Sequence, residues 1–206
     1  MLFVYLLFVV SKYTIEGNFV SRLYIEVDHG TFNDNVPFMY LFKENILYKI
    51  SSNLELLWKI ELDDEIRHIN MDTAGNVYII FKHGRNIYKY NPNGVKVTYL
   101  YFSDHISKTC RFYRTFISQG RTFLYVLGSL FYDNKCESFV LKYNTHTGEL
   151  LSFDIFNTVD NVAIDDENCE YKDLYVNGDY VFVKGRNTIW KMNIKMQVSW
   201  RLHLRF

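Results

Sequence analysis

Two acidic triplets are the residues whose type and spacing most readily support chemistry. Asp63-Asp64-Glu65 and Asp165-Asp166-Glu167 lie 102 residues apart. Clustered carboxylates can bind Ca²⁺, which takes six to eight oxygen ligands in proteins. Neither triplet has the D-x-D-x-D-G spacing of a dedicated calcium loop. We therefore interpret both as solvated, charged loops and predict no metal-binding residue.

Two Asp-His pairs, Asp28-His29 and Asp104-His105, place a carboxylate beside an imidazole. Such a pair can do acid–base work. Adjacent residues of a strand point to opposite faces, so a pair in a strand does not converge by itself. No Ser or Cys lies in a G-x-S-x-G setting, and nothing in the sequence brings Glu137 and Glu149 together as a glycosidase pair. We predict no catalytic residue.

Arg85 and Arg186 occur in matching Gly-Arg-Asn segments that are 101 residues apart. Their guanidinium groups could bind carboxylates of a partner. We favour the alternative that their aliphatic stems cover apolar surface. The near-identical spacing of these segments and of the acidic triplets indicates that the chain is built from internal repeats.

One segment recurs four times along the chain. The copies are Phe42–Ile50, Phe81–Tyr90, Phe139–Tyr143 and Val183–Met192, and their shared lysines Lys49, Lys89, Lys142 and Lys191 are 40, 53 and 49 residues apart. These intervals are typical of propeller blades with loops of variable length. Within one copy, the continuous apolar run Val77–Phe81 predicts a strand that is buried on both faces.

A turn rich in Asn, Ser, Gly or Pro follows each copy, as expected from the backbone preferences of these residues. An aromatic residue lies five positions beyond each turn, at Trp58, Tyr99, Phe153 and Trp200. Another short run precedes three of the copies and could form an innermost strand, at Ile66–Met71, Arg111–Ile117 and Tyr171–Val176. The first repeat offers only Leu2–Val10, Tyr13–Ile15 and Phe19–Val27.

The pattern predicts an all-β protein, a β-propeller of about five four-stranded blades whose first blade lacks its innermost strand. We place the blades approximately at 1–27, 28–62, 63–102, 103–156 and 157–206, within a single domain. A ring of blades leaves only short, protected strand edges. An incomplete first blade leaves a gap that a partner chain could close.

The repeats resemble the blades of quinoprotein-like (PQQ-like, YVTN/WD40-type) propellers. The residues that carry this resemblance are Ile46–Asn53–Trp58, Ile87–Gly94–Tyr99, Val140–Gly148–Phe153 and Ile189–Asn193–Trp200, within roughly residues 36–204. The resemblance implies the fold and leaves the activity open, because propellers host many unrelated functions. Quinone-dependent members of the family use adjacent cysteines near the cofactor, and this chain has none, so we predict no cofactor.

The composition narrows the classes of partner. Lys plus Arg equals Asp plus Glu at 23 each, with no basic run, which argues against nucleic-acid binding. Cys110, Cys136 and Cys169 are widely spaced and odd in number, which argues against zinc and favours a reducing compartment. The apolar Met1–Val10 is half the length of a membrane span and has no basic region before it. We expect a buried strand there, with no signal peptide and no membrane span.

The functional hypothesis that follows is a non-catalytic structural propeller with protein partners in a larger assembly. The abundance of Asn, Ile, Lys, Tyr and Phe, which have AT-rich codons, together with the open first blade, favours a component of a phage tail or a phage-tail-like particle that is assembled inside a cell. The alternative is a lectin-like propeller that binds a glycan through Tyr and Trp side chains. A third hypothesis is a small hydrolase or lyase, which a pocket lined by functional polar groups would favour.

Overall fold

The computed structural model describes residues 2–6, 9–14, 16–33, 35–83, 86–100, 109–118, 122–132, 135–160, 173–177, 180–185, 188–193 and 198–203. All regular elements in these ranges are strands, and they form five antiparallel sheets. The described part of the chain contains no helix with the length and hydrophobicity that a membrane span requires.

Each sheet is a meander whose strands pair in chain order. The first sheet contains β1 (Leu2–Leu6), β2 (Val9–Tyr13) and β3 (Phe19–Tyr24), and the second contains β4 (His29–Phe32), β5 (Phe38–Lys43), β6 (Ile46–Ser51) and β7 (Leu56–Glu61). The third sheet contains β8 (Ile66–Met71), β9 (Val77–Phe81), β10 (Ile87–Tyr90) and β11 (Lys96–Leu100). The fourth contains β12 (Thr109–Ile117), β13 (Phe123–Tyr132), β14 (Lys135–Asn144) and β15 (Leu150–Asp160), and the fifth contains β16 (Asp173–Asn177), β17 (Tyr180–Lys184), β18 (Thr188–Asn193) and β19 (Val198–His203).

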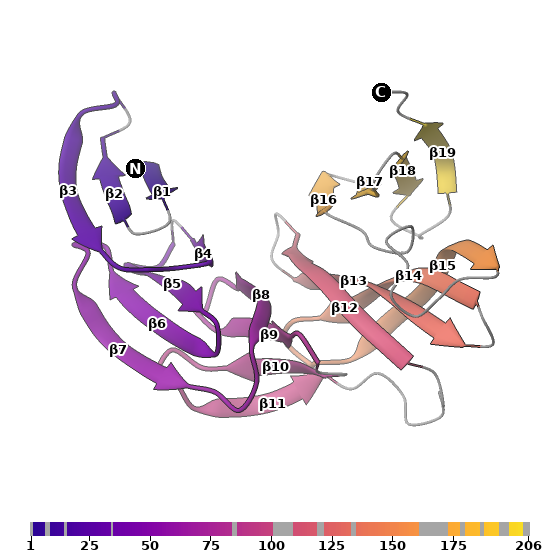
Figure 1. Cartoon of the computed structure of the whole chain (residues 1–206), viewed down its shortest axis with the longest axis horizontal. Coiled ribbons are helices and arrows are strands. Elements are labelled where there is room, and N and C mark those ends of the chain that lie inside the picture. The colour runs from indigo at the N-terminus through magenta and orange to yellow at the C-terminus, as the bar shows by residue number, and fades with distance from the viewer. Residues whose placement is uncertain are drawn as a thin grey trace.

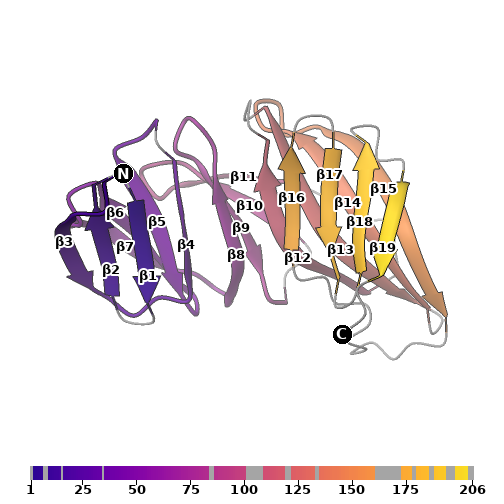
Figure 2. The ribbon, with the colours of Figure 1, turned by 90° about the horizontal axis from the view of Figure 1, so that it is seen from above.

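The five sheets follow one another around an open arc (Figure 1). The first strands of the four-stranded sheets lie next to one another, since β8 contacts both β4 and β12, and β12 contacts β16. Seen from above, the strands within each sheet run side by side (Figure 2). The predicted all-β architecture of four-stranded units is confirmed, and the predicted runs at Ile66–Met71, Arg111–Ile117 and Tyr171–Val176 correspond to β8, β12 and β16.

The described first sheet has three strands, and they match the last three strands of the other sheets. A register shift falls at Lys12/Tyr13 in β2, and the same shift falls at Lys49/Ile50 in β6. The expectation of a first sheet without its innermost strand therefore agrees with the observed pairing. The prediction of one strand over Leu2–Val10 is wrong, because Leu6 pairs with Val9 and the chain has reversed between them.

The four aromatic residues that lie five positions beyond the turns do not share one register position in their sheets. Trp58 and Trp200 pair with Lys49 and Lys191, the repeated lysines of their sheets. In the third sheet the repeated lysine Lys89 pairs with Thr98, so Tyr99 is one residue out of step. A shift of one residue moves a side chain to the other face of a sheet. Phe153 is displaced in the same way, because Lys142 pairs with Ser152.

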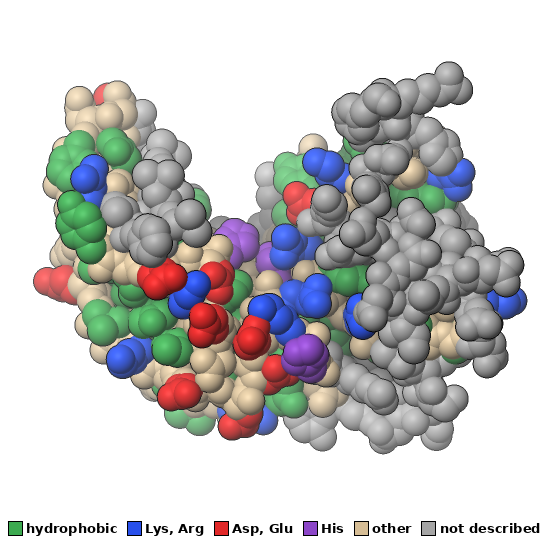
Figure 3. All heavy atoms as spheres, in the orientation of Figure 1, with side chains coloured by type: hydrophobic (Ala, Val, Ile, Leu, Met, Phe, Trp, Pro, Cys, Tyr) green, Lys and Arg blue, Asp and Glu red, His purple; other side chains and the backbone are tan. Residues whose placement is uncertain are grey.

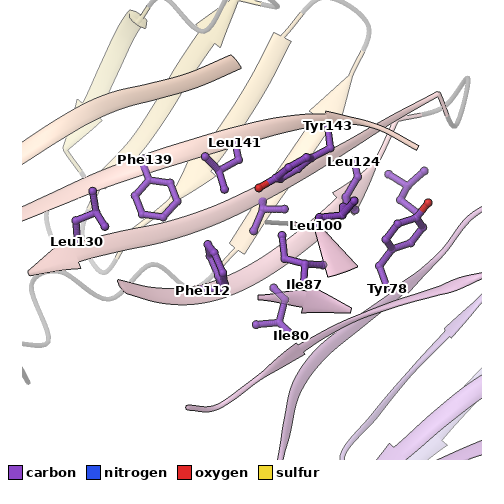
Figure 4. Packing of buried hydrophobic residues seen from close by; sticks show 12 residues of the cluster. Tyr78, Ile80, Ile87, Leu100, Phe112, Leu124, Leu130, Phe139, Leu141 and Tyr143 are labelled. Carbon is purple, nitrogen blue, oxygen red and sulfur yellow. The ribbon is translucent and has the colours of Figure 1, made fainter. Parts of the chain in front are cut away.

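Large apolar side chains fill the space between neighbouring sheets. Figure 4 shows one such cluster, with Tyr78, Ile80, Ile87 and Leu100 of the third sheet against Phe112, Leu124, Leu130, Phe139, Leu141 and Tyr143 of the fourth. Every residue of β9 is buried, as the continuous apolar run predicted. Burial of this kind stabilises a fold by about 25 cal/mol per Å² of apolar surface removed from water. Cys136, fully buried on β14, is disulfide-bonded, a bond that the cysteine spacing did not indicate.

Repeated lysines also join neighbouring sheets. Each lies on the penultimate strand of its sheet and reaches the turn that follows the penultimate strand of the next sheet. Lys12 Nζ donates to the Ser52 carbonyl oxygen at 2.6 Å, Lys49 Nζ to Pro92 at 2.8 Å, and Lys89 Nζ to Thr145 at 3.1 Å. A hydrogen bond from a charged donor is stronger than a neutral one. The repeat therefore fixes the distance between consecutive sheets, and with it the positions of the strands that line the arc.

Candidate functional site

A pocket of about 260 Å³ lies where the first strands of the four-stranded sheets meet. All four strands contribute to it, so it faces the inside of the arc. The lining residues are His29, Gly30, Thr31, His68, Ile69, Asn70, Thr115, Phe116, Asp173, Leu174 and Tyr175. In the space-filling view, histidine side chains gather in the hollow between the two arms of the arc (Figure 3). The pocket is smaller than the roughly 300–1,000 Å³ typical of sites for drug-sized ligands, so it suits a smaller molecule.

Two matching irregularities interrupt the strands that line this pocket. The pairing of β8 with β9 skips Arg67, so that His68 follows a bulge. The pairing of β12 with β13 skips Tyr113 in the same way, so that Arg114 follows a bulge. A bulge places two residues opposite one and re-aims the side chains beside it. Hydrophobic alternation alone would not have put His68 at this position.

His68 is buried and its ring is held by β12. The backbone N–H of Thr115 lies 3.3 Å from His68 Nδ1, and the Thr115 hydroxyl oxygen lies 3.0 Å from the same atom. A backbone N–H can only donate, so Nδ1 accepts and the proton of the neutral ring lies on Nε2. Burial, the Arg114 guanidinium and the neighbouring His29 lower the pKa of His68 well below its usual range. The ring is therefore neutral at neutral pH and is a hydrogen-bond donor at Nε2.

His29 at the start of β4 packs edge-to-face on His68, with ring centroids 5.6 Å apart. The backbone N–H of Gly30 donates to His29 Nδ1 at 2.8 Å, so this neutral ring also carries its proton on Nε2. Desolvation of the ring and then the Arg114 charge lower the pKa of His29, while the Asp173 carboxylate acts in the opposite direction. Two neutral imidazole donors are thus grouped at one end of the pocket.

The remaining polar groups of the pocket include a carboxylate and an amide. Asp173 begins β16 and is exposed to solvent, and its Oδ1 accepts the backbone N–H of Leu174 at 2.9 Å. Asn70 donates from Nδ2 to the Thr115 carbonyl oxygen at 3.2 Å, which ties β8 to β12 beside the histidines. Phe116 and Tyr175 pack edge-to-face at 5.4 Å and form an apolar wall. The arrangement suits a small ligand that has several oxygen acceptors.

The residues that the sequence singled out as candidates do not gather in this pocket. Asp28 does not share the pocket with His29, since its carboxylate accepts the Glu44 backbone N–H at 2.8 Å and forms an ion pair with Lys43. In the first acidic triplet, Glu65 forms an ion pair with Lys82, which lies just after β9. Of the two histidines in the pocket, only His29 was among the sequence candidates, and its side chain is exposed at the pocket.

Glu137 and Glu149 do not form a catalytic pair. Tyr132 donates to Glu137 near the start of β14, while Glu149 lies exposed beyond the other end of that strand, roughly 20 Å away at the rise of an extended chain. Asp104-His105, Asp165-Asp166-Glu167, Arg85 and Arg186 lie outside the described residues. Within the described residues, no group of three or more His, Cys, Asp or Glu side chains is arranged to hold a metal ion.

No family profile matches this sequence, and no relative is found among curated proteins. Solved structures do match. Hydrazine synthase of Kuenenia stuttgartiensis has a TM-score of 0.69 at 14% identity, covering 95% of this chain and 60% of that one. The periplasmic gluconolactonase PpgL of Pseudomonas aeruginosa has a TM-score of 0.62 at 10% identity (95% and 62%), and a putative 6-phosphogluconolactonase of Bacteroides uniformis has 0.61 at 12% identity (95% and 64%).

These similarities establish the β-propeller fold, and WD40-type domains are among the matching structures. The chain spans about three fifths of the length of the structures it matches. The prediction of a non-catalytic structural component is contradicted by the comparisons, because proteins named as lactonases are among the matching propellers. Nothing in the comparisons supports a phage tail. Codon-related composition reflects the genome and carries no information about the chemistry of a site.

Proposed function

We propose that this chain is the pocket-bearing part of a hydrolase-type propeller that opens the ring of a small sugar lactone. The observation that supports this proposal is the pair of neutral imidazoles, His29 and His68, whose Nδ1 atoms each accept a backbone N–H. Each ring keeps its proton on Nε2 and can donate it to a carbonyl oxygen. The titles of two matching structures name lactonases of sugar acids, and such a ligand is small and rich in oxygen acceptors.

The residues of the pocket can supply both a general base and hydrogen-bond donors for lactone hydrolysis. A water molecule attacks the carbonyl carbon and gives its proton to the Asp173 carboxylate. The imidazole N–H groups of His29 and His68 stabilise the negative charge that develops on the carbonyl oxygen, as preorganised hydrogen-bond donors do. The bond between the carbonyl carbon and the ring oxygen then breaks, and the departing alkoxide recovers the proton from Asp173. The products are a hydroxyl group and a carboxylic acid.

The test is release of acid from D-glucono-1,5-lactone by the purified chain, followed with a pH indicator against the uncatalysed rate. Asp173→Asn keeps an oxygen to accept the Leu174 N–H but removes the base, so we expect the rate to fall by about 100-fold or more. His68→Asn keeps an acceptor for the Thr115 N–H and removes the Nε2 donor, with an expected loss of about 100-fold.

The matched control is His83→Asn, which removes an exposed histidine outside the pocket and should leave the rate unchanged. A wild-type rate equal to the uncatalysed rate for a panel of sugar lactones would refute the proposed activity. A rate that Asp173→Asn leaves unchanged would refute the role given to this carboxylate.

A further inference from the structure

The last sheet carries a lysine that matches the lysines joining the other sheets. Lys191 lies on the penultimate strand β18, with a register shift at Lys191/Met192, as at the corresponding lysines of the preceding sheets. Its Nζ lies 3.7 Å from the centre of the Tyr180 ring, a position that Lys49 shares over Phe38 at 3.8 Å. The aromatic ring thus holds the lysine in the same pose in the second and last sheets.

Lys191 differs from its counterparts in what lies beyond its tip. Lys12, Lys49 and Lys89 each donate to a backbone carbonyl oxygen in a turn of the next sheet. The last sheet is followed by no further sheet, and Lys191 Nζ has no such acceptor among the described residues. A donor in the same pose thus lacks the carbonyl that its counterparts bind.

Apolar side chains around Lys191 are also less buried than the residues at equivalent register positions in the other sheets. Phe182 corresponds in register to Tyr40, Tyr78 and Tyr125, because each pairs with the repeated lysine of its sheet. Those three tyrosines are essentially fully buried against the next sheet. Phe182 is only half-buried. An aromatic residue at this register position is therefore buried by the next sheet in the second, third and fourth sheets, but only half-buried in the last sheet.

Two further positions of the last sheet are also more exposed than their equivalents in other sheets. Ile189 corresponds to Leu47, Ile87 and Val140, two residues before the repeated lysine; all three are completely buried, whereas Ile189 is half-buried. Leu202 pairs with Ile189 as Leu100 pairs with Ile87, yet Leu202 is 48% exposed and Leu100 is 3% exposed. We call Tyr180, Phe182, Ile189, Lys191 and Leu202 the terminal face.

We propose that the terminal face binds a further four-stranded antiparallel blade, provided by polypeptide outside residues 1–206, and that Lys191 donates to a backbone carbonyl oxygen in the turn after its penultimate strand. The side chains exposed here are those that bury against the next sheet in the body of the arc, and the ammonium group lacks the carbonyl partner that Lys12, Lys49 and Lys89 have. The matching propellers are longer, since this chain covers 60–64% of their length. This inference is independent of the proposed lactone hydrolysis.

The first experiment measures acylation of individual lysines by an N-hydroxysuccinimide ester, read by mass spectrometry. The isolated 206-residue chain is compared with the protein purified under native conditions from its source. We expect Lys191 to react at least about tenfold more slowly in the native material, because a bound blade buries it. Lys59, exposed on β7, is the matched control and should react equally in both. Equal reactivity of Lys191 in both samples would overturn the proposal.

The second experiment identifies what covers the face. A photo-crosslinking p-benzoylphenylalanine replaces Phe182, and in a control it replaces Leu57, which is exposed on the outer strand β7. The expected product joins position 182 to a peptide outside residues 1–206 whose sequence contains the strand–turn–strand repeat, and position 57 does not give it. A crosslink to a second copy of residues 1–206, or no crosslink at position 182, would contradict the assigned occupant.

Discussion

Replacement of His68 by asparagine should make the fold less sensitive to acid. His68 is buried, and Thr115 holds its neutral ring through a backbone N–H at 3.3 Å. Burial and the nearby Arg114 charge lower its pKa in the folded state. The unfolded chain therefore binds a proton at this residue before the folded chain does. Stability is unaffected well above the unfolded pKa of about 6.5 and falls as the pH drops through it.

The magnitude follows from proton linkage. A histidine that stays neutral in the fold while its unfolded form titrates near 6.5 costs about 2 kcal/mol of unfolding free energy between pH 7.5 and pH 5.0. Wild type should therefore lose about 2 kcal/mol more than His68→Asn over this range, apart from any loss at pH 7.5 from the smaller side chain. With a urea m-value of about 2 kcal/mol/M, the difference is about 1 M in midpoint.

The assay is urea unfolding followed by tryptophan fluorescence at both pH values, with His83→Asn as the control for removing an exposed histidine. The control should lose as much stability in acid as wild type does. The reasoning about His68 fails if His68→Asn and wild type lose the same free energy between pH 7.5 and pH 5.0, because the buried ring would then titrate alike in the folded and unfolded states.

Two further expectations concern the contacts between sheets, and both are measured by urea unfolding at pH 7.5. Lys49→Met removes the hydrogen bond to the next sheet and should cost about 1–2 kcal/mol, whereas Lys59→Met on the exposed face should change little; equal effects would argue against the sheet-to-sheet contact. Gly75 has a positive φ, and a Cβ added there would lie 2.5 Å from the Phe38 ring, whereas Gly17 has a positive φ and open space around it. Gly75→Ala should therefore lower the free energy of unfolding by about 1–3 kcal/mol more than Gly17→Ala does. Similar losses of stability in the two variants would show that the ring moves aside freely.

Much of the fold could be predicted from the sequence because its determinants are local. The continuous apolar run of β9 and the turn residues after each penultimate strand specify strands and hairpins without knowledge of their neighbours. Repetition of these local signals predicted the five sheets and the missing strand of the first. The register of strand pairing was harder to predict from the sequence. Trp58 lies opposite the repeated lysine of its sheet, while Tyr99 lies one position away from the equivalent pairing. Bulges change the number of residues between a turn and a given pair.

The candidate site could not be predicted because it consists of residues that are distant in the sequence and come together only when four sheets pack. His68 and Thr115 are 47 residues apart in the chain, and Asp173 belongs to yet another sheet. A bulge, which leaves no clear mark in a single sequence, precedes His68 on β8. The glutamate pair and the acidic triplets stood out because they are close in sequence or repeated, but proximity along the chain does not determine proximity in space.

By itself, the sequence determined the fold class, the repeat and the position of the lysines, since apolar periodicity and turn chemistry act over a few residues. Only the tertiary structure decided what those lysines bind, which histidines share a pocket, and which face of the last sheet has no neighbouring sheet among the described residues. These properties depend on distances between separate sheets and on the loss of water around particular side chains. Residues of the same type thus differ in their contacts: Lys49 donates to a carbonyl oxygen of the next sheet, whereas Lys191 lies over the ring of Tyr180 in its own sheet.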